Sequence, residues 1–258
     1  MFMPSQESTP GPTALVTGAS RGIGRAIAEL LARRGCRVAV HCRASLDLAE
    51  GVAGSLPGGG HRAFAADLAS PADTGRLWQE VTAAMGPVAV LVNNAGIFED
   101  HPLWDTDFDQ WQQAWRHTLD TNLVGPANLC HLAGNAMAAA GGGRMVNISS
   151  RGAFRGEPVA PAYGASKAGL NAMTQSLALA LASRRVYCFV VAPGYVETDM
   201  AAEALTGPRG PGILAQYPMG RVARPEEVAA AAVFCALDAP AAMTGSILDV
   251  NGASYLRT

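Results

Sequence analysis

Short apolar runs, many of them rich in β-branched residues, recur along the chain and alternate with longer segments. Runs of this kind predict buried strands. They lie at 13–18, 37–42, 63–67, 88–96, 144–150, 186–194 and 246–252. The longer segments predict helices: residues 23–35 show apolar positions at helical spacing, and residues 70–86 open with Ser70 as a cap and Pro71 in the first turn. Further helices are predicted at 107–139, 162–184 and 225–238.

The alternation of strand and helix continues to the end of the chain, and the strands are apolar on both faces. This pattern indicates an α/β fold, a doubly wound (Rossmann-type) parallel sheet of about seven strands with helices on both faces. No linker, composition break or internal repeat divides the chain. We therefore expect a flexible tail at 1–11 and a single domain at 12–258. Residues 199–224 are predicted to be irregular.

Composition narrows the function classes. The chain has 258 residues, of which 49% are hydrophobic and 16% charged. A surface this sparsely charged favours burial of part of it in an oligomer. The net charge of −2 offers no footprint for nucleic acid or an anionic membrane. No run approaches the ~20 apolar residues of a membrane span, and no signal peptide is predicted at the N-terminus.

The five cysteines are odd in number and form no CxxC pair. Most lie in apolar runs, so buried, reduced thiols and a cytoplasmic location are expected. They are Cys36, Cys42, Cys130, Cys188 and Cys235.

The first strand leads into the sequence TGASRGIG, with glycines at 18, 22 and 24, and then into a helix. A glycine-rich turn lets the backbone approach a ligand closely, and the helix N-terminus offers free N–H groups to a phosphate. The spacing is GxxxGxG rather than GxGxxG, and such a turn can also be purely structural. Its place after the first strand favours dinucleotide binding.

The end of the second strand bears on the choice of nucleotide. An acid near this point holds the ribose 2′-hydroxyl of NAD in dinucleotide folds. Here Cys42 and Arg43 stand instead, and Arg21 lies in the glycine loop. Two arginines and no acid favour NADP over NAD, because a guanidinium suits a 2′-phosphate. The ordinary alternative is that Arg43 is a solvated loop residue.

Tyr163 and Lys167 are four positions apart, so they share one face of the predicted helix. An ammonium near a phenol favours the phenolate, and we expect Lys167 to lower the pKa of Tyr163. Such a tyrosine can give a proton to a ketone or take one from an alcohol. Spacing alone equally allows a surface lysine near a core tyrosine.

Two polar residues extend this site. Ser150 ends the fifth strand, where ligands bind in such sheets, and its hydroxyl can hold a substrate oxygen. Asn122 lies in a predicted helix four positions before Pro126, which lacks the N–H that would bond the carbonyl of residue 122. That carbonyl is free to hold a water, although an ordinary proline kink explains it as well.

Seven short motifs then appear in order. They are TGASRGIG (17–24), NNAG (93–96), TNLVG (121–125), NISS (147–150), YGASK (163–167), PGYVET (193–198) and GRVARPEEVA (220–229). Through them the chain resembles the short-chain dehydrogenase/reductase family over residues 12–256, and within it most the 3-oxoacyl-acyl-carrier-protein reductases. Any single motif is weak evidence, but the set is highly specific.

The resemblance implies a role for each matching residue. Tyr163 matches the catalytic acid/base, and Lys167 the lysine that lowers its pKa and bonds the nicotinamide ribose. Ser150 matches the serine that orients the carbonyl, and Asn122 the asparagine of a proton relay. Asp67 and Leu68 match adenine contacts, Asn94 and Gly96 contacts behind the adenosine ribose, and Pro193, Gly194 and Thr198 contacts to the nicotinamide end. The full set of implied cofactor-binding residues is Gly18, Ser20, Arg21, Gly22, Ile23, Gly24, Arg43, Asp67, Leu68, Asn94, Ala95, Gly96, Tyr163, Lys167, Pro193, Gly194, Val196 and Thr198.

Two features bear on partners. The five histidines form no HxxxH pair, so no metal is expected, and ordinary loop or helix positions explain them.

The family's carrier-protein reductases tend to have a basic cluster before the fifth strand, but here only Arg144 remains, with Arg184 and Arg185 nearby, so carrier docking is in doubt. The apolar run LALALA at 177–182 could face the core on one side and a subunit on the other, as in the tetramers common in the family.

The sequence thus predicts an NADPH-dependent enzyme that interconverts a ketone and a secondary alcohol, most like a 3-oxoacyl thioester reductase. The alternative is a dehydrogenase of a sugar, polyol, steroid or other small secondary alcohol. Sugar-nucleotide epimerases share the tyrosine and lysine but usually have a longer C-terminal domain. A non-catalytic nucleotide sensor should lack Ser150, Tyr163 or Lys167, and this chain has all three.

Overall fold

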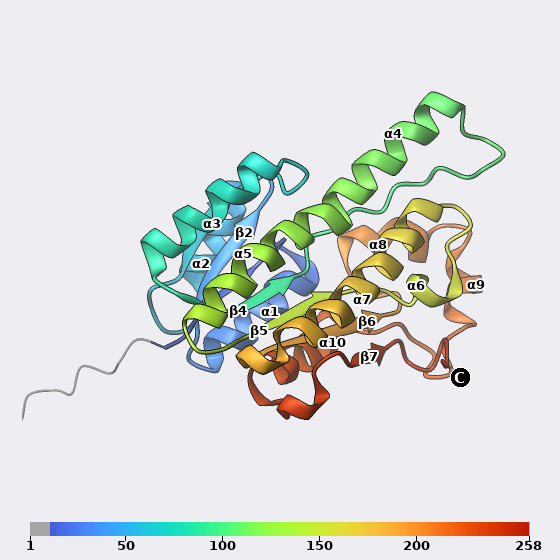
Figure 1. Cartoon of the computed structure of the whole chain (residues 1–258). Helices are drawn as coiled ribbons and strands as arrows, with labels where there is room; N and C mark the ends of the chain where they lie inside the picture. Colours follow the sequence, from blue (N-terminus) through green and yellow to red (C-terminus); the bar gives the residue numbers. More distant parts are fainter. Residues whose placement is uncertain (1–10, 258) are drawn as a thin grey trace, which may run out of the picture.

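Seven parallel strands form one sheet in the computed structural model, which describes residues 11–257 (Figure 1). The strand order is β3-β2-β1-β4-β5-β6-β7, so the predicted doubly wound parallel sheet is confirmed. Several strands end earlier than predicted, because their last residues already turn into loops. The strands are β1 (Thr13–Val16), β2 (Arg37–Cys42), β3 (Arg62–Ala65), β4 (Val88–Asn93), β5 (Gly143–Ile148), β6 (Val186–Pro193) and β7 (Ile247–Val250).

Helices cover both faces of the sheet, and this explains the apolar strands. In β1, Ala14 and Val16 belong to one buried cluster and Leu15 to the other, since successive side chains point to opposite faces. One face packs against α1 (Gly22–Arg33), α2 (Leu46–Ser55) and α10 (Pro225–Val233). The other face packs against α3 (Pro71–Met85), α5 (Gly125–Ala139) and α7 (Pro161–Leu181).

The helix predicted at 107–139 is continuous but changes its winding midway. It comprises α4 (Phe108–Leu119), one π-turn η1 (Asp120–Val124) and α5, whose first turn contains Pro126. The N–H of Gly125 donates to the carbonyl of Asp120, which is the wider spacing of a π-helix. The helix therefore contains a π-bulge directly before Gly125 and Pro126. In Figure 1, α4 and the segment before it extend away from the sheet.

The prediction of an irregular segment at 199–224 is wrong for its first half. This segment contains α8 (Asp199–Thr206) and α9 (Gly210–Leu214). Ile213, Tyr217 and Val222 form a small buried cluster of their own, against which Leu205 packs. The glycines and prolines of the segment hide these helices in the sequence, and the cluster stabilises them. Smaller elements are α6 (Gly152–Arg155), η2 (Ala182–Arg184), η3 (Phe234–Asp238) and η4 (Ala241–Met243).

Several local predictions are confirmed. All five cysteines are free and buried. Ser70 caps α3 by accepting a hydrogen bond from the N–H of Asp73 at 3.2 Å. In the run 177–182, Ala178 is buried and Leu179 is 87% exposed, so the run has one inner and one outer face.

Two further predictions concern the division of the chain into a tail and a domain, and membrane spans. The division into a tail and one domain stays a prediction, since residues 1–10 of the tail lie outside the described residues. Among the helices formed by residues 11–257, none has both the length and the apolar character that a membrane span requires.

Candidate active site

The candidate site lies at the carboxyl edge of the sheet. There the strand order reverses between β1 and β4, and such a switch point is where ligands bind in open α/β sheets. The glycine loop follows β1, and Asn94 to Gly96 follow β4. Ser150 follows β5, and Pro193 ends β6. The residues predicted from separate motifs therefore meet at one edge.

The glycine loop needs its glycines. Gly18 and Gly22 have positive φ angles of 63° and 54°, which L side chains rarely adopt. A Cβ on Gly18 would lie 2.9 Å from the Cα of Ala95, and a Cβ on Gly24 would lie 2.2 Å from the carbonyl oxygen of Gly18. The loop thus passes close to the segment after β4 and to its own helix.

The N-terminus of α1 fits a phosphate. Its N-cap residue, Arg21, makes no side-chain capping bond, and the first turn contains no acidic residue. The first N–H groups of a helix have no partner within it and favour an anion. Together with the glycine backbone, they form a site that suits the pyrophosphate of a dinucleotide.

Asn94 has a structural role that the sequence did not predict. Its amide nitrogen Nδ2 donates to the carbonyl oxygens of Thr17 at 2.9 Å and Gly18 at 3.1 Å. The hydroxyl of Thr17 accepts from the N–H groups of Asn94 and Ala95. Asn94 therefore fixes the start of the glycine loop to the end of β4.

Arg21 and Arg43 lie on neighbouring segments. The N–H of Ala19 donates to the carbonyl oxygen of His41 at 2.8 Å, which places the loop bearing Arg21 beside the strand end bearing Arg43. Arg43 is exposed, and its side chain makes no hydrogen bond or ion pair with the rest of residues 11–257. Arg21 is 3.9 Å from Asp199 in an ion pair that is exposed on both sides.

The other predicted cofactor residues differ in their contacts and in how far they are exposed. A Cβ on Gly22 would lie 3.3 Å from Cγ2 of Thr198, so the PGYVET segment does meet the glycine loop. Asp67 is exposed, and its carboxylate accepts from the N–H of Ala69 at 3.0 Å. Leu68 is buried, and its carbonyl oxygen lies 2.5 Å from where a Cβ on Gly125 would stand. Ser20, Ile23 and Gly194 are partly exposed at this edge, whereas Pro193 and Val196 are buried.

Ser150, Tyr163 and Lys167 come together around the phenol. The Ser150 hydroxyl hydrogen-bonds to the Tyr163 side chain. The Lys167 nitrogen Nζ lies 5.7 Å from the centroid of the Tyr163 ring. Lys167 is 4% exposed, and its Nζ donates to the carbonyl oxygen of Ile148 at 2.9 Å. The sequence-predicted alternative of a surface lysine is therefore wrong.

The pKa of Tyr163 differs from the prediction. Burial raises the pKa of Tyr163 to about 12. The hydrogen bond with Ser150 acts in the opposite direction, but its effect on the pKa is smaller. The nearby Glu157 and Tyr195 add smaller upward contributions. Burial also lowers the pKa of Lys167 to about 8. The expected lowering of the Tyr163 pKa by Lys167 is thus not found: burial dominates, and the hydrogen bond with Ser150 is the contribution that opposes it.

Asn122 connects the π-bulge to the same site. Its side chain is fully buried, with Oδ1 accepting from the N–H of Ile97 at 2.8 Å and Nδ2 donating to the carbonyl oxygen of Ile97 at 2.9 Å. A Cβ on Gly96 would lie 3.3 Å from Asn122 Oδ1 and 3.4 Å from Lys167 Nζ. Asn122 and Lys167 therefore flank the same glycine, and all four predicted catalytic residues share one neighbourhood.

Sequence reasoning missed three residues of this neighbourhood. Ser166 accepts from Asn122 Nδ2 at 3.3 Å and donates to the carbonyl oxygen of Tyr163 at 2.7 Å, so it links two predicted residues. His41 and His101 are each buried and hydrogen-bonded on both ring nitrogens. The expectation that ordinary loop or helix positions explain them is wrong for His41, which lies in β2. A histidine inside an apolar strand was the available signal.

A polar group borders the site on the side of α8 and α9. Arg151, the residue after Ser150, is 4% exposed and donates to Oε1 of Gln216 at 3.2 Å. Its guanidinium lies 5.7 Å from the ring centroids of Tyr195 and Tyr217. Arg155 donates to the same oxygen of Gln216. Nearby Glu157 is half-buried, and burial raises its pKa.

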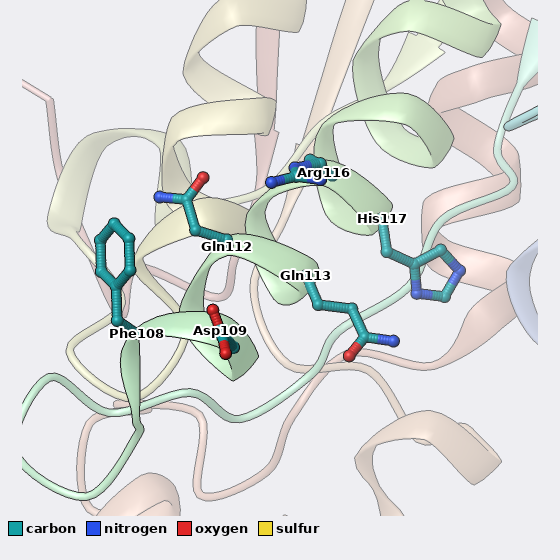
Figure 2. A pocket seen from close by; sticks show the side chains of 6 residues that line it. All are labelled: Phe108, Asp109, Gln112, Gln113, Arg116 and His117. Atoms are coloured by element: carbon teal, nitrogen blue, oxygen red, sulfur yellow. The ribbon is translucent and has the colours of Figure 1, made fainter.

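Two other features of the molecule contribute little to the chemistry. A surface hollow on α4 is lined by side chains of that helix alone, none of which is a predicted site residue (Figure 2). It is formed by Phe108, Asp109, Gln112, Gln113, Arg116 and His117. Within residues 11–257, no group of three or more His, Cys, Asp or Glu side chains could hold a metal ion.

Comparison with known proteins agrees with this geometry. A family model described as "Enoyl-(Acyl carrier protein) reductase" matches residues 18–253. The 3-oxoacyl-[acyl-carrier-protein] reductase FabG of Escherichia coli (strain K12) is 39% identical over 246 residues, which cover 95% of this chain and 98% of that protein. The D-threitol dehydrogenase of Mycolicibacterium smegmatis is 38% identical over 248 residues, covering 94% of this chain and 92% of that protein.

A solved structure is also similar. It is a proposed NAD(P)-dependent gluconate 5-dehydrogenase from Beutenbergia cavernae with NADP bound at low occupancy. It superimposes with a TM-score of 0.87 at 39% identity, covering 96% of this chain and 98% of that one. The fold, the clustered motifs and these similarities agree, and the chain belongs to the short-chain dehydrogenase/reductase family of oxidoreductases.

Proposed function

We propose that this oxidoreductase uses NADPH to interconvert a ketone and a secondary alcohol, with Tyr163 as the acid and base. The observation on which this rests is the meeting of Ser150, Tyr163 and Lys167 beside the glycine loop. Burial keeps the Tyr163 phenol protonated at neutral pH, with a pKa of about 12. A protonated phenol can donate to a ketone oxygen, so the proposed direction is reduction.

The residues at the carboxyl edge fit a dinucleotide. The glycine loop and the α1 N-terminus would hold its pyrophosphate, and Arg21 with Arg43 a 2′-phosphate. NADPH, when bound, supplies the hydride for the carbonyl carbon. The similar solved structure contains NADP, which supports this choice of nucleotide.

Each proposed catalytic residue then has one task. The Ser150 hydroxyl donates to the carbonyl oxygen and orients it, while Tyr163 transfers the proton to that oxygen. Lys167 stabilises the phenolate left behind, since a cation near a phenolate lowers its energy. Asn122 fixes Ile97 and Gly96 beside Lys167 and takes part in resupplying the proton.

A 3-oxoacyl thioester is the first proposed substrate. The support is the 39% identity to the E. coli 3-oxoacyl-[acyl-carrier-protein] reductase over 95% of this chain. Docking of an acyl carrier protein through Arg144 has no support. The guanidinium of Arg144 is turned inward, where it donates to the carbonyl oxygens of Cys235 at 2.9 Å and Ala239 at 2.7 Å.

A small sugar or polyol is the second candidate. The polar side chains of Arg155, Glu157 and Gln216 beside the site suit hydroxyl groups better than an acyl chain. Identity to a D-threitol dehydrogenase and similarity to a proposed gluconate 5-dehydrogenase add support.

A substrate panel separates the two candidates. Acetoacetyl-coenzyme A with NADPH and D-threitol with NADP are followed at the absorbance of reduced nicotinamide. Faster reduction of the thioester supports the first candidate, and faster oxidation of the polyol the second. Turnover at background on every carbonyl and alcohol, with NADPH bound, would show a nucleotide sensor and contradict the proposal.

The proposed role of Tyr163 has its own test. Tyr163→Phe should lower kcat by about 10²- to 10⁴-fold while NADPH binding is retained. Tyr187→Phe is the matched control, because Tyr187 lies at the start of β6, away from the carboxyl edge. Equal turnover of Tyr163→Phe and the control would refute the assignment.

We also propose a cytoplasmic homotetramer. Five free, buried thiols suit a reducing compartment. Large apolar side chains on and before α4 are exposed, among them Trp104 at 90% and Phe108 at 74%. Exposed apolar surface of this kind favours association between subunits. Light scattering of the purified protein tests the tetramer, and a monomeric mass would refute it.

A further inference from the structure

His101 lies in the segment between β4 and α4 and is 2% exposed. Its ring is fully hydrogen-bonded, with Nδ1 lying 2.8 Å from the carbonyl oxygen of Glu99 and Nε2 accepting from the N–H of Ala162 at 3.1 Å. A carbonyl only accepts and an amide N–H only donates. These partners therefore require the neutral tautomer with the proton on Nδ1.

The bond to Ala162 occupies the N-terminus of α7. The first N–H groups of a helix lack partners within it, and at α7 the N-cap residue Ala160 makes no side-chain capping bond. Pro161 has no N–H to satisfy. The next N–H of the helix is that of Ala162, and it donates to His101, which lies 61 residues earlier in the chain. Ala162 is the residue directly before Tyr163.

The same segment also touches Tyr163 directly. The ring of Phe98 meets the Tyr163 ring edge-on, with centroids 4.9 Å apart. On one side of Phe98 the Asn122 side chain holds both backbone groups of Ile97. On the other side, the N–H of His101 donates to the carbonyl oxygen of Val159 at 2.7 Å. The segment is therefore fixed at both ends around the Phe98 contact.

The helix α4 completes the enclosure of His101. Its Trp111 ring packs against the imidazole with centroids 5.6 Å apart. The side chains that line the hollow of Figure 2 come from the same helix, and one of them, His117, pairs with Glu99 at 2.9 Å. The imidazole, which Trp111 covers on one side, is thus almost out of contact with water, and hydrogen bonds are stronger in such surroundings.

We propose that His101 is a positioning residue for Tyr163: by capping α7 and anchoring residues 97–101, it fixes the phenol where the proton is transferred. This inference rests on the proposed role of Tyr163. His101 touches neither substrate nor cofactor in this assignment and acts through the first turn of α7. A displacement of about 1 Å at a reacting group can cost about 100-fold in rate, so loose anchoring is expected to show in kcat.

The test compares His101→Phe with His101→Gln. Phenylalanine keeps a ring against Trp111 but loses both hydrogen bonds, whereas the glutamine amide can again accept from the N–H of Ala162. We expect His101→Phe to lower kcat on acetoacetyl-coenzyme A or D-threitol, whichever is turned over, by about 10- to 100-fold. NADPH affinity and KM should change less than about threefold, and His101→Gln should recover most of kcat. Amide hydrogen exchange of the peptide containing Ala162 to Gly164 should be faster in the Phe variant and restored by Gln.

Controls separate the possible failures. His131→Phe, at an exposed position on α5, should leave every readout unchanged. If Tyr163→Phe keeps its activity, the proposed function fails, whereas loss in Tyr163→Phe with no loss in His101→Phe overturns only the present inference. Equal losses in kcat and NADPH affinity, or no recovery with Gln, would also overturn it. If His101→Phe does not fold, His101→Leu replaces it in the same comparison.

Discussion

Lys167 Nζ lies 5.7 Å from the centre of the Tyr163 ring, and both side chains have lost most of their contact with water. Burial disfavours the charged form of each group, so it raises the pKa of the phenol to about 12 and lowers that of the ammonium to about 8. The pair is thus arranged with a protonated phenol beside an amine that can gain or lose its proton near neutral pH. This arrangement suits a proton donor that must be reprotonated after each turnover.

Replacement of Lys167 should lower the activity without lowering the stability of the protein. Lys167→Met removes a buried cation whose burial is costly, so the melting temperature should stay the same or rise. Without the cation, the phenolate formed during reduction loses its stabilisation, and kcat should fall by about 100-fold or more. Thermal unfolding and steady-state kinetics on the same preparation measure both. A fall in melting temperature that accompanies the loss of kcat would instead assign Lys167 a structural role.

The sequence was informative wherever local pattern decides structure. The strands from Thr13 to Val250 and most helices follow from apolar runs and spacing, because these patterns reflect burial on one or two faces. The motif residues Ser150, Tyr163 and Lys167 also met as expected. The short helices α8 and α9 were missed, because contacts of Ile213 and Tyr217 stabilise them against their glycines and prolines.

What the sequence could not show depends on contacts between distant residues. Spacing predicted that Lys167 would lower the pKa of Tyr163, but the extent of burial, which reverses the direction, is a tertiary property. The bonds of His101 to Ala162 and of Asn122 to Ile97 join segments 61 and 25 residues apart. No local pattern marks such pairs, so a buried polar residue reveals its partner only in the fold.

Asn122 should matter for both stability and catalysis. Asn122→Ala would leave the N–H and carbonyl of Ile97, a partly buried residue, without their partners. An unsatisfied buried group costs about 1–3 kcal/mol, and 1 kcal/mol shifts the melting temperature by about 2–4 °C in a domain of this size, so the melting temperature should fall by about 2–12 °C, and kcat should fall with it. Asn135→Ala, an exposed residue on α5 that bonds only the carbonyl of His131, is the control. Equal melting temperatures for the two variants would contradict this prediction.

Arg43 should decide between the two nicotinamide cofactors. It is exposed and makes no bond within residues 11–257, as expected of a residue that serves a ligand. Arg43→Asp should weaken NADPH binding by about 10- to 100-fold, because a charge-assisted bond is replaced by repulsion, and should leave NADH binding unchanged or stronger. Fluorescence titration with each nucleotide measures this. Arg33→Asp, at the opposite end of α1, is the matched control, and equal losses for both nucleotides would refute the role of Arg43.

His41 should make the stability of the protein depend on pH. Its Nδ1 accepts from the N–H of Gly18 at 3.2 Å, its Nε2 lies 3.0 Å from the carbonyl oxygen of Ala66, and burial lowers its pKa from 6.5 to about 4. Between these two pKa values the unfolded chain binds a proton that the folded chain excludes. The free energy of unfolding should therefore fall as the pH drops from about 6.5 to 4, by about 3 kcal/mol over the full window.

Urea unfolding at a series of pH values tests this dependence through the variant His41→Asn. Asparagine does not titrate, so the slope between pH 6.5 and 4 should be shallower than in the wild type, whereas His131→Asn should leave the slope unchanged, since His131 is exposed. Because the same imidazole accepts from Gly18 in the glycine loop, His41→Asn should also weaken NADPH binding at neutral pH. A slope equal to that of the wild type would show that His41 takes up its proton in the folded chain as readily as in the unfolded one.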